Sequence, residues 1–141
     1  MHSVIIIDDD PAPMAFYIKA FQDSGFNVKH ITTVREAIHD IETAVVPPDA
    51  YVLDIMMPPG DELPLEQSNY GLTSGIEIYK RIRAKYQNIP IVVLTNVSAP
   101  HILAQLPISD VFLKTIAKID TLPFALINIV EDMYAHKGTA Q

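Results

Sequence analysis

The stretch that decides the fold is VIIIDDDPAP, residues 4–13. Its first four residues are β-branched and apolar, which is typical of a strand buried on both faces. Three aspartates follow at once, and Asp10-Pro11 suits a helix start, because proline lacks the backbone N–H that the first turn leaves unpaired. The stretch therefore predicts a buried strand that ends in acids and leads into a helix.

Short apolar runs and helical patterns alternate along the rest of the chain. Further strands are predicted at 26–31, from Ala50 to Asp54, at 89–96 and at 110–114. Helices are predicted after Pro11, from the capping boxes that open at Thr33 and Ser74, near 99–105 and over 120–135. Strands that alternate with helices predict one α/β domain with a parallel sheet and helices on both faces.

The composition limits the function classes. The 141 residues suit one domain, and 49% hydrophobic with 19% charged residues is a globular balance. No cysteine is present, which excludes disulfides and thiolate metal sites. The net charge of −7, with basic residues gathered only at 80–85, argues against nucleic-acid binding. No apolar run reaches the ~18 residues of a membrane span, and no signal peptide opens the chain, so we expect no membrane association and a cytoplasmic location.

Polar groups gather where the predicted strands end. In an open parallel sheet, ligands bind outside the carboxyl ends of the strands. The groups at those ends are Asp8, Asp9 and Asp10 after strand one, Asp54 after strand three, Thr95 after strand four and Lys114 after strand five. Asp10 suits a helix cap. Asp8, Asp9 and Asp54 would repel one another if strand three lies beside strand one, and a hard divalent cation such as Mg²⁺ relieves that repulsion.

These residues resemble the receiver domain of two-component response regulators, the CheY-like superfamily, over almost the whole chain. The paired acids match Asp8 and Asp9, and the phosphoacceptor in LDIMMP, residues 53–58, matches Asp54. The hydroxyl residue matches Thr95 and the lysine matches Lys114. The resemblance implies a single-domain, flavodoxin-like, doubly wound sheet of five parallel strands in the order 2-1-3-4-5, over residues 1–141.

The resemblance also implies a function. Asp54 would accept a phosphoryl group from the phosphohistidine of a sensor histidine kinase or a histidine phosphotransfer protein. Mg²⁺ would be held by Asp8, Asp9, Asp54 and the backbone carbonyl of Met56. Lys114 would pair with Asp54 and then with the phosphoryl group, and the Thr95 hydroxyl would bind a phosphoryl oxygen. We expect no conventional enzyme, but a module that signals to an unknown protein partner, with no output domain within this chain.

The sequence departs from the family pattern at three places. About a dozen extra residues lengthen the loop over about 59–73, which we expect to gate access or select the partner. Thr115 stands where proline usually follows the lysine, and Val111 stands where the family has an aromatic switch residue. The coupling of the hydroxyl residue to an aromatic ring is therefore open.

Two other functions compete with this interpretation. A receiver-like interaction module that needs no phosphorylation would tolerate the changes at Thr115 and Val111, although the intact acids argue against it. A Mg²⁺-dependent phosphohydrolase with an aspartyl nucleophile would want a second acid two residues after Asp54, where Met56 stands. A flavin-binding protein is more distant, since no phosphate-cradling loop follows strand one. The histidines at 2, 30, 39, 101 and 136 show no metal-ligand spacing and are expected to be scattered surface residues.

Overall fold

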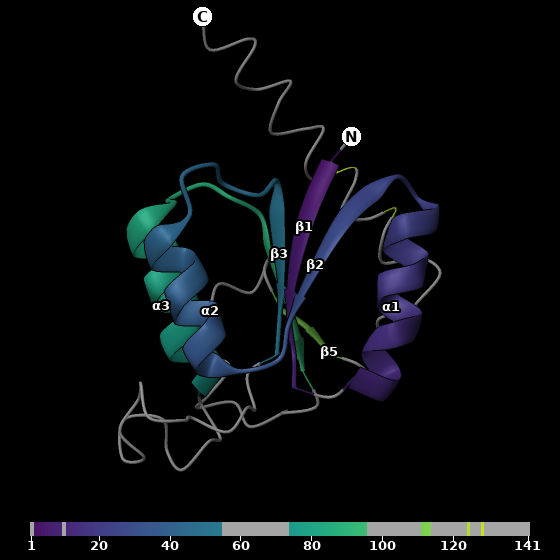
Figure 1. Ribbon diagram of the computed structural model, residues 1–141, viewed down its shortest axis with the longest axis horizontal. Helices are drawn as coiled ribbons and strands as arrows, with labels where there is room; N and C mark the ends of the chain where they lie inside the picture. The colour runs from purple at the N-terminus through teal and green to yellow at the C-terminus, as the bar shows by residue number, and fades with distance from the viewer. Residues whose placement is uncertain are drawn as a thin grey trace, which may run out of the picture.

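The computed structural model shown in Figure 1 describes residues 2–9, 11–54, 74–95 and 111–113, together with Phe124 and Asn128. In chain order the elements are β1 (His2–Ile7), α1 (Pro11–Asp23), β2 (Phe26–Ile31), α2 (Val34–Thr43), β3 (Ala50–Leu53), α3 (Ser74–Lys85), β4 (Ile91–Thr95) and β5 (Val111–Leu113). Phe124 and Asn128 are helical, as predicted for 120–135. The predicted helix near 99–105 lies outside the described residues.

All the strands belong to one parallel sheet in the order β2-β1-β3-β4-β5, which confirms the predicted topology. β1 lies between β2 and β3, with Ile7 paired to Ile31 on one side and to Leu53 on the other. Right-handed crossovers produce this order when the chain winds one way from β1 to β2 and then the other way from β2 through β3 to β4. The strand ends that carry Asp8 and Asp54 therefore lie side by side.

Each face of the sheet has its own core, because successive strand residues point to opposite faces. In Figure 1, α2 and α3 cover one face and α1 covers the other. Ile5 and Ile7 of β1 pack with the apolar side chains of α2 and α3. Val4 and Ile6 pack under α1, against Met14 and Phe21. The four residues of β1 at 4–7 are all buried, as this run of β-branched residues predicted.

The helix boundaries follow local chemistry. The Thr33 side chain accepts a hydrogen bond from the Glu36 amide, so the predicted capping residue is confirmed. Gly25 follows α1 with φ +94°, a left-handed conformation that favours glycine at a helix end. α2 ends at Thr43, and Lys85 donates hydrogen bonds to the carbonyls of Ile41 and Ala44 there. α3 begins at Ser74 itself rather than after it.

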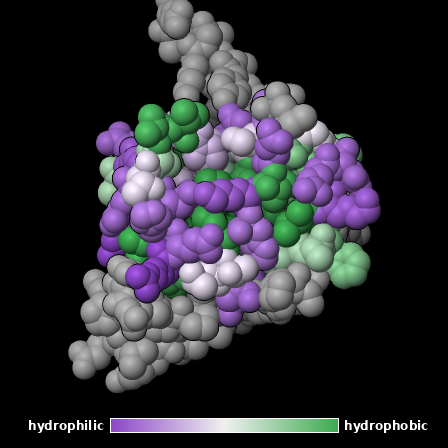
Figure 2. Space-filling model, in the orientation of Figure 1, coloured by the Kyte–Doolittle hydropathy of each residue, from purple (hydrophilic) through white to green (hydrophobic). Residues whose placement is uncertain are grey.

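The surface between α2 and the strands is partly apolar. Figure 2 shows hydrophobic residues between hydrophilic ones on this face of the molecule. Val45 and Val46, which follow α2, are 94% and 80% exposed. Within the part of the chain that the structure describes, no helix has both the length and the hydropathy to cross a bilayer.

Candidate functional site

The structure brings Asp8, Asp9 and Asp54 together at the carboxyl edge of the sheet. One carboxylate oxygen from each of the three lies within 4.8 Å of the others. Asp8 is 1% exposed and Asp54 is 7% exposed, whereas Asp9 is open to solvent. We call these three residues the acidic triad. Its formation confirms the expectation that strand three places Asp54 beside the acids of strand one.

Main-chain hydrogen bonds fix two members of the triad. The Asp8 amide donates to the Ile31 carbonyl at 3.0 Å, which extends the β1–β2 ladder by one step. The Asp54 amide donates to the Ile7 carbonyl at 2.9 Å, which does the same between β3 and β1. The two buried carboxylates therefore stand on adjacent strands whose backbones are held rigidly to one another.

The donor set of the triad fits a hard divalent cation. Carboxylate oxygens are the protein ligands that Mg²⁺ prefers. Octahedral Mg²⁺ with ligands near 2.1 Å separates neighbouring oxygens by about 3 Å and opposite oxygens by about 4.2 Å. Separations of up to 4.8 Å need only a small contraction to reach those values. Three negative groups this close, two of them almost out of water, are better stabilised by a bound cation than by solvent.

A histidine that sequence spacing did not single out also reaches this edge. The Nε2 atom of His30, in β2, lies 2.9 Å from the main-chain oxygen of Asp8. Because a carbonyl oxygen only accepts, Nε2 carries the proton and donates it. His30 is half-buried, and the expectation of scattered surface histidines did not include its bond to the backbone of this site. A hydrogen bond from a side chain to a backbone atom leaves no spacing pattern in a sequence.

The remaining predicted site residues are placed only in part. Thr95 is the last residue of β4 and pairs with Leu113 of β5, immediately before Lys114 in the chain. The ends of β4 and β5 therefore lie together, as the sequence predicted. The Thr95 side chain, Met56, Lys114, Thr115 and the loop at 59–73 lie outside the described residues. Their roles stay predictions.

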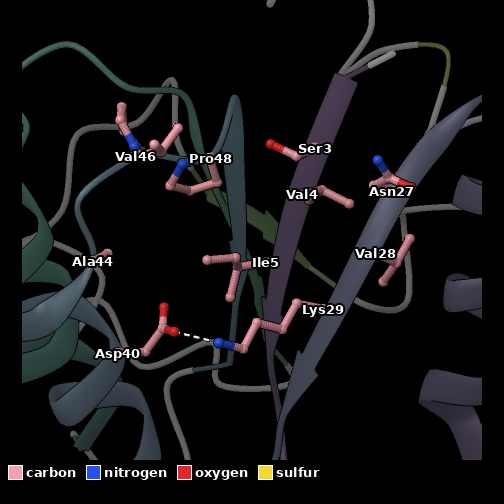
Figure 3. Close-up of a pocket in the computed structure, with 11 residues that line it drawn as sticks. Ser3, Val4, Ile5, Asn27, Val28, Lys29, Asp40, Ala44, Val46 and Pro48 are labelled. Carbon is pink, nitrogen blue, oxygen red and sulfur yellow. Dashed lines mark hydrogen bonds and ion pairs between the residues drawn. The ribbon is translucent and has the colours of Figure 1, made fainter.

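A separate hollow lies near the amino ends of β1 and β2. Figure 3 shows this pocket of about 320 Å³, with Ser3, Val4 and Ile5 on one side and residues that follow α2 on the other. An ion pair between Lys29 and Asp40 crosses its lower end. Most of the pocket lining is aliphatic, and its ion pair is satisfied internally. Among the described residues, the carboxylates that could hold a metal ion lie in the acidic triad, at the opposite ends of these strands.

Comparison with known proteins decides the family. The family model of the response regulator receiver domain matches residues 4–123. The chain belongs to this family. The matched residues contain the acidic triad and the whole sheet apart from the first two residues of β1. Receiver domains are signalling modules of two-component systems rather than conventional enzymes, and they typically bind Mg²⁺.

Individual relatives agree with this assignment. The receiver is 32% identical over 92 residues to the response regulator MprA of Mycolicibacterium vanbaalenii, a match that covers 65% of this chain and 33% of that protein. The chain thus spans about a third of the length of that relative. The receiver domain of a Francisella response regulator superposes with a TM-score of 0.71 at 23% identity, covering 94% of this chain and 99% of that one. A CheY-like receiver domain protein from Methanospirillum hungatei gives 0.71 at 14% identity, covering 100% and 99%. These two likenesses show the shared fold.

Proposed function

We propose that Asp54 accepts a phosphoryl group from a phosphohistidine, carried by a sensor histidine kinase or a histidine phosphotransfer protein. The observation that carries this proposal is the acidic triad. Asp54 stands at the end of β3 with two more carboxylates within 4.8 Å. That arrangement suits a nucleophile beside a cation site and has no use in packing, because close carboxylates oppose folding.

The step needs little covalent chemistry from the protein. An Asp54 carboxylate oxygen attacks the phosphorus, an O–P bond forms, and the P–N bond to the donor imidazole breaks. The electron pair of that bond returns to the imidazole nitrogen, which takes up a proton. Phosphoryl transfer asks for alignment and charge neutralisation. The hydrogen bond from the Asp54 amide to Ile7 holds the nucleophile at the end of a fixed strand.

The other predicted residues would complete the charge balance. Asp8, Asp9, Asp54 and the Met56 carbonyl would hold Mg²⁺, which supplies positive charge beside the carboxylates and the phosphoryl oxygens. Lys114 would pair with Asp54 and then with a phosphoryl oxygen. The Thr95 hydroxyl would donate to another phosphoryl oxygen. These roles rest on the family resemblance and on the adjacent ends of β4 and β5.

We further propose that the phosphorylated receiver signals through contact with a downstream protein in the cytoplasm, and that the loop at 59–73 gates access to Asp54 or selects the partner. Deletion of residues 61–72 tests the second idea. An unchanged rate of phosphotransfer together with unchanged partner choice would end it.

Labelling with a small phosphodonor tests the central proposal. The receiver is incubated with phosphoramidate in Mg²⁺ or in EDTA, and the mass of the intact protein is followed. We expect one added phosphoryl group in Mg²⁺ and none in EDTA. Asp54→Asn should abolish the labelling, whereas Asp23→Asn, which alters an exposed carboxylate on α1, should leave it intact. No labelling of the unaltered receiver would favour the interaction module, and steady turnover of a phosphomonoester would favour the phosphohydrolase.

A further inference from the structure

The main chain of Asp8 is bonded to β2 through both of its polar atoms. Its amide donates to the Ile31 carbonyl at 3.0 Å, and its carbonyl accepts from His30 Nε2 at 2.9 Å. In a parallel ladder, both main-chain groups of one residue point to the same neighbouring strand. The two partners of Asp8 therefore lie where the continuation of β2 would lie.

The His30 ring takes the place of a missing backbone donor. Ile7 pairs with Ile31, so a longer ladder would pair Asp8 with Thr32 and would bond the Asp8 carbonyl to the amide of Thr33. β2 ends at Ile31, however, and Thr33 already caps α2. The His30 imidazole extends from β2 past the end of the ladder and donates a hydrogen bond to the Asp8 carbonyl in place of a backbone amide.

This carbonyl belongs to the peptide that joins Asp8 to Asp9. A hydrogen bond to it restrains rotation about that peptide, and so fixes how the carboxylate of Asp9 stands relative to that of Asp8. Asp9 needs such a restraint most, because its side chain is exposed and no sheet hydrogen bond holds it within the described residues. The two carboxylates must converge for the triad to bind one ion.

We infer that His30 is a positioning residue for the metal site: its Nε2–H bond to the Asp8 carbonyl orients the Asp8–Asp9 peptide so that both carboxylates converge on Mg²⁺. This inference rests on the proposed function, since it assumes that the triad binds Mg²⁺. Groups that orient metal ligands through hydrogen bonds typically change metal affinity by about 10–100-fold when they are removed.

Paired substitutions separate this role from a general effect on folding. In His30→Gln the amide nitrogen can reach the place of Nε2, whereas in His30→Asn the shorter side chain mimics only Nδ1. His30→Ala removes the donor altogether. His39→Ala, on the exposed face of α2, is the matched control. The Mg²⁺ dissociation constant of each variant is measured from the amide NMR shifts of the triad at one fixed pH, and the free energy of unfolding is measured in EDTA.

We expect Mg²⁺ binding to weaken about tenfold or more in His30→Ala and His30→Asn, and to stay within about threefold of the unaltered receiver in His30→Gln. His39→Ala should bind normally. A purely structural role would lower stability in EDTA yet leave the Mg²⁺ dissociation constant unchanged. If the unaltered receiver and all four variants bound Mg²⁺ with the same dissociation constant, this inference would be wrong while the proposed function would stand. Failure of the unaltered receiver to bind Mg²⁺ would overturn the metal site of the proposed function and this inference with it.

Discussion

Replacement of Asp54 by asparagine should stabilise the metal-free receiver. The carboxylate oxygens of Asp8 and Asp54 lie within 4.8 Å of each other, and both side chains are almost removed from water. Two unit charges at that separation repel by about 3.5 kcal/mol at an effective dielectric constant near 20, and by about 0.9 kcal/mol at that of water. Because asparagine has nearly the same shape without the charge, removal of this repulsion should raise the free energy of unfolding by about 1–3 kcal/mol in EDTA, less the contribution of the proposed ion pair between Asp54 and Lys114.

Urea unfolding followed by circular dichroism measures this change, in EDTA and in Mg²⁺. At ten times its dissociation constant, Mg²⁺ should stabilise the unaltered receiver by about 1.4 kcal/mol. Asp54→Asn lacks one ligand and should gain less, so the two proteins should approach one another in Mg²⁺. The matched control is Asp23→Asn, whose exposed ion pair with Lys19 is worth at most about 1 kcal/mol and should not respond to Mg²⁺.

Two results would refute the reasoning. If Asp54→Asn were less stable than the unaltered receiver in EDTA, repulsion within the triad would not dominate the electrostatics of the site. If Mg²⁺ stabilised both proteins equally, the ion would bind elsewhere. Either outcome is separate from phosphorylation, because no phosphodonor is present.

Three further changes test the packing and the local chemistry of the fold by urea unfolding. Burial raises the pKa of the Tyr51 phenol, so its neutral form is favoured in the folded state; stability should fall above about pH 10 in the unaltered receiver and less steeply in Tyr51→Phe, and equal pH profiles would contradict this. Thr33→Ala should cost about 1 kcal/mol through loss of the α2 cap, whereas its neighbour Thr32→Ala should cost less. Phe21→Ala should cost about 3–5 kcal/mol because the ring is fully buried, whereas Phe16→Ala, 65% exposed, should change stability little.

The fold could be predicted because its signals are local. The β-branched run at 4–7 has to be buried on both faces, and the structure divides it between two cores. Capping at Thr33 depends on near neighbours and was predicted correctly, and the left-handed glycine after α1 has an equally local origin. Element ends were less accurate: β1 begins at His2 rather than Val4, because His2 continues the ladder with Phe26. Such ends depend on pairing between distant segments.

The acidic triad could be predicted because topology alone brings it together. Asp8 and Asp54 are far apart in the sequence, but each follows a buried strand, and the parallel order places those strands side by side. The positions of the strand ends and the order of the sheet are enough to place these carboxylates together, whatever conformations the side chains adopt.

His30 shows what this kind of argument misses. The ring donates a hydrogen bond to a backbone carbonyl. Because every residue carries a carbonyl, the residue type at position 8 gives no sign of this contact. The Asp8 carbonyl needs a side-chain donor because β2 ends at Ile31 and α2 is capped at Thr33. The spacing of residues in the sequence does not fix such boundaries to within one residue. Close carboxylates weaken the fold, and a receiver that keeps them must hold their backbone in place against that repulsion. We therefore expect other groups that support such a site to lie, like His30, where a regular ladder ends beside the acids and leaves a main-chain atom to be satisfied by a side chain.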